Sequence, residues 1–133
     1  MKISTKGRYA LIIMINLARN YKDGKYISLK EISEKENISL KYLEKIMIQL
    51  NKDDYLDVLR GNNGGYRLKK EPKYYQVGDI LRRVEGSLSP ISCIEQDTCD
   101  KRESCDTHEF WEGLYDEINK YVDSKTLQDY IGG

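Results

Sequence analysis

The sequence predicts a mainly α-helical fold: a winged helix-turn-helix with a two-stranded wing and a long C-terminal dimerisation helix. Three observations predict it. Two short amphipathic helices are joined by a tight turn, a glycine-rich hairpin follows them, and the longest amphipathic helix lies near the end of the chain. With 133 residues, the chain can form one globular domain that carries a dimerisation arm. We expect a winged-helix domain over residues 1–86, a loop over residues 87–106, and a dimerisation helix with its tail over residues 107–133.

The first expected helix begins at Thr5, which can cap it, and ends at Arg19 or Asn20. Its middle, ALIIMINLA, is apolar on nearly every side, so more than one side must be buried. One side can face its own domain and another a partner chain. Hydrophobic residues make up only 39% of the chain, so a single copy would have a thin core. Both observations favour a homodimer.

The next two expected helices carry clear start and stop signals. Ser28 and Glu31 form a capping box, and Asn37 tolerates the positive φ that ends such a short helix. Ser39 caps a third helix, which runs from Leu40 to about Lys52. Two short helices in this arrangement form a helix-turn-helix, whose second helix can enter the major groove of DNA. A plain helical hairpin is the alternative. The buried stripe of the third helix consists of Leu43, Ile46, Met47 and Leu50.

A hairpin follows the helix-turn-helix. Tyr55–Arg60 predicts a strand, Gly61–Gly65 a tip that can adopt positive φ, and Tyr66–Leu68 the return strand. A helix-turn-helix followed by such a ribbon is a winged helix. Arg60 stands beside a tip with little side-chain bulk, so we expect it to enter the minor groove. The glycines precede a strand rather than a helix, which excludes a nucleotide-phosphate loop.

The net charge of zero hides an unequal distribution along the chain. Residues 1–70 contain fifteen Lys and Arg against eight Asp and Glu, a net charge of +7, whereas residues 71–133 contain seven against fourteen, a net charge of −7. A basic half is typical of a protein that binds a polyanion, although a random fluctuation of surface charge is an alternative. We therefore expect double-stranded DNA as a partner. The candidate contacts are Lys2, Thr5, Lys6 and Arg8 for phosphates, Ser39, Leu40, Lys41, Tyr42, Glu44 and Lys45 for the major groove, and Arg60, Gly61, Asn62, Asn63, Gly64 and Gly65 for the minor groove.

Two further helices are expected after the wing. Residues Gln76–Val84 have an apolar face and are followed by Gly86, a good terminator. The last and longest helix covers Thr107–Lys125, with Asp106 as N-cap and Glu109 completing a capping box. Its apolar residues recur at three- and four-residue spacing, and we expect them to pack across a two-fold axis. They are Phe110, Trp111, Leu114, Tyr115, Ile118, Tyr121 and Val122, and Leu127 and Tyr130 can add a last turn.

All three cysteines and the only histidine of the chain lie close together, as C-x5-C-x5-C-x2-H. The four candidate metal ligands are Cys93, Cys99, Cys105 and His108. Gaps of five residues are too long for the C-x2-C knuckle of most structural zinc sites and suit a loop around an iron–sulfur cluster. A structural Cys3His zinc site, a metal-free thiol switch and a helix-capping role for His108 are the alternatives.

The chain shows no signal-peptide pattern, and no segment approaches the roughly 18–20 apolar residues of a membrane span. We therefore expect a cytoplasmic protein with no membrane partner. In a reducing compartment, metal ligation is favoured over a disulfide framework, which three cysteines would leave incomplete.

The chain resembles the Rrf2-type winged-helix transcription regulators along nearly its whole length. The matching motifs are STKGRYA at residues 4–10, ISLKYLE at residues 38–44, Arg60-Gly61 with Gly64-Gly65-Tyr66, and VGDI and VEG at residues 77–80 and 84–86. The C-x5-C-x5-C-x2-H pattern is similar to that of the iron–sulfur cluster regulators in this family. The resemblance implies a homodimer with a [2Fe-2S] cluster in each subunit, repression of cluster-assembly genes, and the iron–sulfur assembly machinery as cluster donor. The implied ligands are Cys93, Cys99, Cys105 and His108.

The chain departs from that branch in two respects. Its tail ends early, at Gly133, and Lys41 and Lys45 stand where the branch often has small or uncharged polar residues. The operator sequence is therefore not implied. A nitric-oxide-sensing branch holds a [4Fe-4S] cluster and can use an aspartate of the first helix, but this chain has Arg8 there and also has His108, which favours [2Fe-2S]. A redox-linked interaction protein is the alternative outside the family, and no nucleophile–base pair indicates an enzyme.

Overall fold

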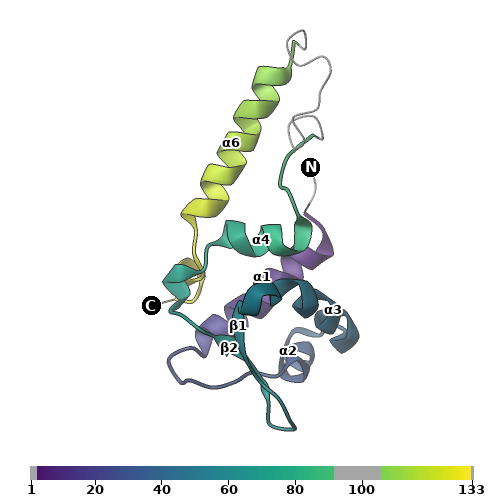
Figure 1. Ribbon diagram of the computed structural model, residues 1–133, viewed down its shortest axis with the longest axis vertical. Helices are drawn as coiled ribbons and strands as arrows, with labels where there is room; N and C mark the ends of the chain where they lie inside the picture. The colour runs from purple at the N-terminus through teal and green to yellow at the C-terminus, as the bar shows by residue number, and fades with distance from the viewer. Residues whose placement is uncertain (1–2, 92–105, 133) are drawn as a thin grey trace.

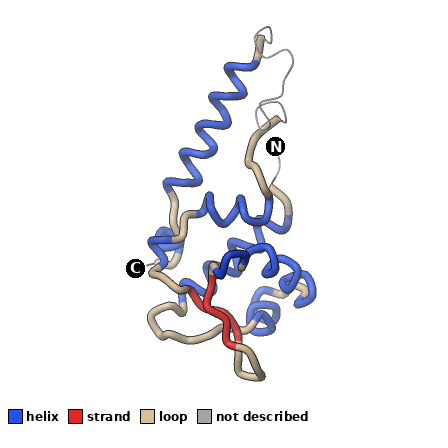
Figure 2. Tube along the Cα trace, in the orientation of Figure 1, coloured by secondary structure: helices blue, strands red, loops and turns tan. Residues whose placement is uncertain are grey.

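The structure is a computed structural model that describes residues 3–91 and 106–132. Within these described residues, three α-helices come first, then a two-stranded antiparallel sheet, then two more α-helices (Figures 1 and 2). The helices are α1 (Thr5–Arg19), α2 (Leu29–Glu36), α3 (Leu40–Leu50), α4 (Val77–Glu85) and α6 (His108–Ser124). The strands are β1 (Leu56–Leu59) and β2 (Gly65–Leu68), and the 3-10 turns are η1 (Lys52–Asp54), η2 (Pro72–Tyr74) and η3 (Leu127–Tyr130).

The core of the winged helix forms around α1. Ala10, Ile13, Met14 and Leu17 of this helix are almost fully buried, because α3 and α4 both pack on it. The predicted stripe of α3 and the predicted apolar face of α4 are buried against it, as expected from their spacing. The side chains on the other sides of α1, among them Leu11, Ile12 and Ile15, are only partly buried.

Local signals determine the helix-turn-helix. Ser28 and Glu31 form the predicted capping box, in which Ser28 Oγ accepts from Glu31 N at 3.1 Å and Glu31 Oε2 accepts from Ser28 N at 3.3 Å. Asn37 ends α2 in the left-handed conformation, with φ 55°. Both predictions are confirmed, and they place α3 directly after a tight turn.

The first strand of the wing is shorter than predicted, and the second is one residue longer. β1 covers Leu56–Leu59 rather than Tyr55–Arg60, and β2 already begins at Gly65, which was expected in the tip. The strands pair in the register Leu56↔Leu68 and Leu59↔Gly65. Tyr55 leaves the strand because its ring packs edge to face on Tyr75, with the ring centroids 5.0 Å apart.

The helix α6 rises from the winged helix, with its N-terminal end farthest from the body (Figure 1). None of its residues is fully buried. Ile118 and Val122, near its C-terminal end, pack on a small cluster of Val77, Leu81 and Leu88. The turn η3 then returns the chain to the main core through Leu127, which is completely buried. The helix is therefore anchored at its C-terminal end.

Candidate DNA-binding surface and sensor helix

The exposed side of α3 carries the predicted recognition residues. Ser39 Oγ accepts a hydrogen bond from Tyr42 N at 3.3 Å and so caps the helix, as predicted. Lys41, Glu44 and Lys45 are exposed, opposite the buried stripe. Tyr42 is half-buried, and its ring meets that of Tyr9 edge to face at 5.6 Å. The structure therefore presents two cations and one carboxylate from the first turns of α3.

The start of α1 is capped by a residue of α4 and not by Thr5. Thr5 is the first helical residue, and Ser4 holds the N-cap position without a side-chain cap. Glu85 Oε1 accepts from Gly7 N at 2.9 Å, from Ser4 N at 3.2 Å and from the Ser4 hydroxyl. A carboxylate is favourable there because the N-terminus of a helix carries a partial positive charge. The prediction of a Thr5 cap is therefore wrong, since a residue distant in sequence satisfies the free amides.

The predicted phosphate contacts lie on the exposed side of the same helix end. Lys6 Nζ donates to Gln49 Oε1 of α3 at 3.4 Å, so the two helices present their polar side chains together. Arg8 donates to Thr5 Oγ1 at 3.2 Å. Lys2 lies outside the described residues.

The wing tip exposes Arg60, Asn62 and Asn63, the residues predicted to reach the minor groove. Two neighbouring glycines allow the backbone to close this tip. A Cβ on Gly64 would lie 1.9 Å from Leu59 O, and one on Gly65 would lie 2.4 Å from Ile27 O. Gly65 therefore lets the wing approach Ile27. Ile27 and Tyr66 exchange two backbone hydrogen bonds, each of 2.8 Å. The wing is thus tied to the segment that leads into α2.

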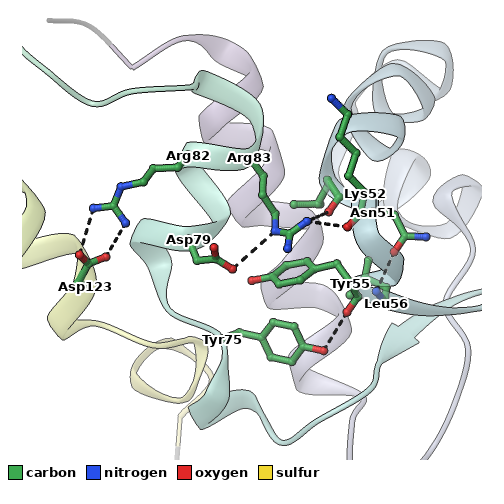
Figure 3. A network of polar contacts seen from close by, with 10 residues as sticks. Asn51, Lys52, Tyr55, Leu56, Tyr75, Asp79, Arg82, Arg83 and Asp123 are labelled. Carbon is green, nitrogen blue, oxygen red and sulfur yellow. Dashed lines mark hydrogen bonds and ion pairs between the residues drawn. The ribbon is translucent and has the colours of Figure 1, made fainter. Parts of the chain in front are cut away.

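A polar network on α4 connects these parts (Figure 3). Arg83 Nη1 donates to Lys52 O at 2.7 Å, beyond the end of α3, and its guanidinium lies 3.6 Å above the Tyr55 ring. Arg82 donates to both carboxylate oxygens of Asp123 in α6, at 2.7 and 3.1 Å. The hydrogen bond to Asp123 raises the pKa of Arg82.

The sequence analysis missed this network. Arg82 and Arg83 are two basic residues in the last turn of an amphipathic helix, where cations are favourable, and that pattern was a usable signal for their importance. The pattern does not predict the partners of Arg82 and Arg83, because these partners lie 31 to 41 residues away in the sequence. They are Leu50, Lys52 and Asp123.

The segment with the candidate metal ligands is described only from Asp106 onward, and Cys93, Cys99 and Cys105 lie outside the described residues. His108 is the first residue of α6, so it lies in the first turn as predicted, although the helix was expected to begin at Thr107. Thr107, not Asp106, holds the N-cap position, and no side chain caps the helix there, so the predicted capping box with Glu109 is wrong. The helix begins one residue later than predicted, so Asp106 precedes the N-cap position by one residue. Thr107 Oγ1 instead accepts from Trp111 Nε1 at 3.2 Å.

The imidazole of His108 is enclosed, with a side chain only 12% exposed. Its Nε2 lies 3.2 Å from Glu112 Oε1, yet neither ring nitrogen makes a hydrogen bond within the described part of the chain. In the described residues, no three His, Cys, Asp or Glu side chains come together as a metal site. Nor does any described helix have the length and apolarity to cross a membrane.

Comparison with known proteins identifies the family. The model of the Rrf2 family, described as iron-dependent transcriptional regulators, matches residues 3–132. The chain belongs to the Rrf2 family. It is therefore a DNA-binding transcriptional regulator and not an enzyme, and the winged helix described above is its DNA-binding fold.

Two named regulators are among the relatives of this chain. CymR of Bacillus subtilis is 41% identical over 129 residues, which cover 97% of this chain and 88% of CymR. IscR of Yersinia enterocolitica is 33% identical over 131 residues, which cover 98% of this chain and 79% of IscR. Solved structures of a CymR and of an IscR also match this chain.

The structure of B. subtilis CymR, the global cysteine regulator, matches with a TM-score of 0.80 and 39% identity, covering 98% of this chain and 96% of that one. T. potens IscR matches with a TM-score of 0.76 and 36% identity, covering 97% of this chain and 85% of that one. The similarity in both cases spans the winged helix and α6.

Proposed function

We propose that this Rrf2 regulator senses iron–sulfur status and represses cluster-assembly genes. In this proposal, Cys93, Cys99, Cys105 and His108 hold a [2Fe-2S] cluster in each subunit of a homodimer. The iron–sulfur assembly machinery is the cluster donor. When bound, the cluster would supply a group whose occupancy follows iron supply and oxidation.

The observation that carries the proposal is the enclosed imidazole of His108. A buried polar atom normally has a hydrogen-bond partner. Neither ring nitrogen of His108 makes a hydrogen bond among the described residues, where Nε2 lies 3.2 Å from Oε1 of its ion-pair neighbour Glu112. A metal–ligand bond is one way to satisfy such a nitrogen. His108 also follows the last cysteine by three residues, and the chain has no other histidine. Three thiolates and one imidazole are donors that fit an iron–sulfur cluster.

The position of His108 gives ligation a mechanical consequence. His108 is the first residue of α6, so a bond at its ring ties the preceding loop to the free end of this helix. The other end of α6 is anchored on α4 and η3. Ligation therefore constrains the end of α6 that the winged helix leaves unsupported.

The proposed reading of DNA uses both exposed parts of the winged helix. The first turns of α3 enter the major groove, where Glu44 can accept a hydrogen bond from a cytosine amino group. Arg60 and the glycine-rich tip enter the minor groove. The phosphate contacts are Lys2, Thr5, Lys6 and Arg8, at and just before the start of α1.

The proposed homodimer uses the apolar residues that α6 leaves exposed. Phe110 and Tyr121 are 63% and 61% exposed, and Leu114 lies between them on the helix. Large apolar side chains in a row on one helix favour a protein partner. A second copy of the chain would also cover the partly exposed sides of α1.

The test of the cluster is anaerobic purification followed by an absorption spectrum and analysis for iron, sulfide and zinc. The expected result is a coloured protein with two irons and two sulfides per subunit. His108→Cys should retain a cluster and lose it more slowly, because a thiolate replaces the imidazole. Glu109→Gln, one residue away on the exposed side, is the matched control. A colourless protein with one zinc, even after reconstitution with iron and sulfide, would contradict the proposal.

The similarity to CymR favours a second candidate function, the control of cysteine-related genes. This candidate needs no cluster. It would be supported by a metal-free protein whose bound promoters belong to cysteine metabolism, identified by sequencing the genomic DNA that it binds.

A DNA titration tests the reading surface in either case. Lys6→Ala, at a proposed phosphate contact, should reduce the slope of log affinity against log salt by about 0.9, the contribution of one neutralised phosphate. Lys73→Ala, an exposed lysine paired with Glu71 behind the wing, is the control and should leave the slope unchanged. Weak binding that neither Lys41→Ala nor Arg60→Ala alters would contradict the proposed surface.

A further inference from the structure

The last turn of α4 holds three helices through three charged side chains. Arg82 reaches α6, Arg83 reaches the end of α3, and Glu85 reaches the start of α1. Figure 3 shows the first two contacts, with the two arginines pointing in different directions from neighbouring positions of the helix. All three side chains are partly buried. One helical turn therefore contacts α6, the end of α3 and the start of α1, which carries candidate phosphate contacts.

The contact of Arg83 with α3 fixes the end of the recognition helix. The last carbonyls of a helix lack partners within the helix. Arg83 Nη1 donates to Lys52 O at 2.7 Å and to Leu50 O at 3.4 Å. Its own position is held by the Tyr55 ring, 3.6 Å from the guanidinium, and by Asp79, whose Oδ2 lies 3.6 Å from Nε. The C-terminal end of α3 thus has a charged anchor in addition to its buried stripe.

The contact of Arg82 with α6 is a forked ion pair. Arg82 donates to both oxygens of Asp123, and Nη2 also donates to Asn119 Oδ1 at 2.8 Å. Such planar, two-point contacts restrict the relative orientation of the two groups more than a single bond does. Gly78 lets the helices approach here, since a Cβ at that position would lie 2.1 Å from Asp123 Oδ1. A tilt of α6 therefore acts directly on α4.

We propose that Arg83 is a positioning residue for DNA recognition, and that the last turn of α4 transmits the orientation of α6 to α3. Arg82 and Arg83 are consecutive residues of one rigid helix, so a rotation imposed through Asp123 moves the anchor on Leu50 and Lys52. The use of this link as a cluster-dependent switch rests on the proposed function, because His108 begins α6. The link itself depends only on contacts between described residues.

A double-mutant cycle on DNA binding tests the link. The probe is a DNA duplex selected from a random-sequence library with the wild-type protein, and the reference is an unselected duplex of equal length. Arg83→Gln should weaken binding of the selected duplex about 10-fold and that of the unselected duplex much less, because phosphate contacts stay in place. Asp123→Asn should weaken the selected duplex about 3-fold. The double variant should bind no more weakly than Arg83→Gln, because both changes break one chain of contacts.

Asp57→Asn supplies the matched control. It breaks the ion pair of Asp57 with Arg67 on the wing, at 3.3 Å, which shares no partner with α4. In the double variant Asp57→Asn with Asp123→Asn, the loss of affinity for the selected duplex should be the product of the two single fold-changes. Multiplicative effects of Arg83→Gln and Asp123→Asn would overturn the proposal. So would an equal loss of affinity for both duplexes, which is the result of a merely structural role.

Two additions keep the test decisive. If Arg83→Gln does not fold, as judged by circular dichroism, Arg83→Lys takes its place in the cycle, because it keeps the positive charge but loses the planar guanidinium that contacts the two carbonyls and the Tyr55 ring. The cycle is measured on the protein as purified and again after any bound metal has been removed by a chelator. A protein without a cluster contradicts the proposed function, whereas additivity in both preparations contradicts the link, so the two failures are distinguishable.

Discussion

The winged helix and α6 differ in how far they bury their apolar residues. The main core draws on α1, α2, α3, both strands and α4, and many of its side chains are fully buried. The helix α6 has no fully buried residue and leaves Phe110 and Tyr121 exposed, and its apolar contacts with the rest of the described chain are at its C-terminal end. The first region is stable through its own packing, whereas the second is placed by a few contacts. A helix that is supported at one end is suited to respond to a group bound at the other.

The largest expected effect concerns the core of the first region. Leu43→Ala, at a side chain that is 0% exposed, should lower the free energy of unfolding by about 2–5 kcal/mol, because it removes buried methyl groups and leaves a cavity. Urea unfolding measures the loss. Ile48→Ala, on the same helix at a side chain 73% exposed, is the control and should cost far less. Equal losses would mean that α3 does not pack as described.

The second prediction concerns the exposed stripe of α6. Phe110→Glu should weaken the proposed dimer by about 2 kcal/mol or more, roughly 30-fold in its dissociation constant, because a charge enters an apolar contact. Sedimentation equilibrium measures the change. Tyr74→Glu, at a similarly exposed aromatic residue on η2, should leave association unchanged. A dimer that tolerates Phe110→Glu must use another surface.

The third prediction concerns the pH dependence of the stability of the winged helix. Burial raises the pKa of Tyr55, and the carboxylate of Asp79 raises it further. The folded state therefore holds this proton more firmly than the unfolded state, so the stabilisation is complete below a pH of about 10 and is lost as pH rises above it. Above that pH the free energy of unfolding falls as pH rises, and Tyr55→Phe should make this fall less steep by up to about 1.4 kcal/mol per pH unit. Urea unfolding between about pH 9 and 11.5 measures it, and an unchanged slope would contradict the burial of the hydroxyl.

The smallest effects are expected at the helix starts. Ser28→Ala removes the capping box of α2 and should cost about 1 kcal/mol. Thr107→Ala at the start of α6 should cost about half of that or less, because the Thr107 hydroxyl accepts from the Trp111 side chain and not from a helix amide. Thermal unfolding followed by circular dichroism compares the two. A larger loss at Thr107 would show that the start of α6 is more important for stability than its contacts indicate.

The parts of the fold that depend on neighbouring residues could be predicted from the sequence. The capping box at Ser28, the left-handed Asn37, the Ser39 cap and the stripe Leu43–Leu50 are each encoded within a few residues. The same holds for the wing, although packing of Tyr55 on Tyr75 shortened its first strand. The sequence alone also grouped three thiols and one imidazole, because their clustering needs no structure to be seen.

The cap of α1, the anchor of α3 and the joint to α6 were decided only by the tertiary structure. Each depends on a charged residue of α4 meeting a partner that lies 31 to 81 residues away. Periodicity identifies the apolar face of α4 but says nothing about which distant backbone or carboxylate its polar residues meet. Hydrogen bonds and ion pairs need defined distances and angles, and these arise only when the helices have packed. The sequence by itself therefore determined what the elements are, and packing determined which of them move together.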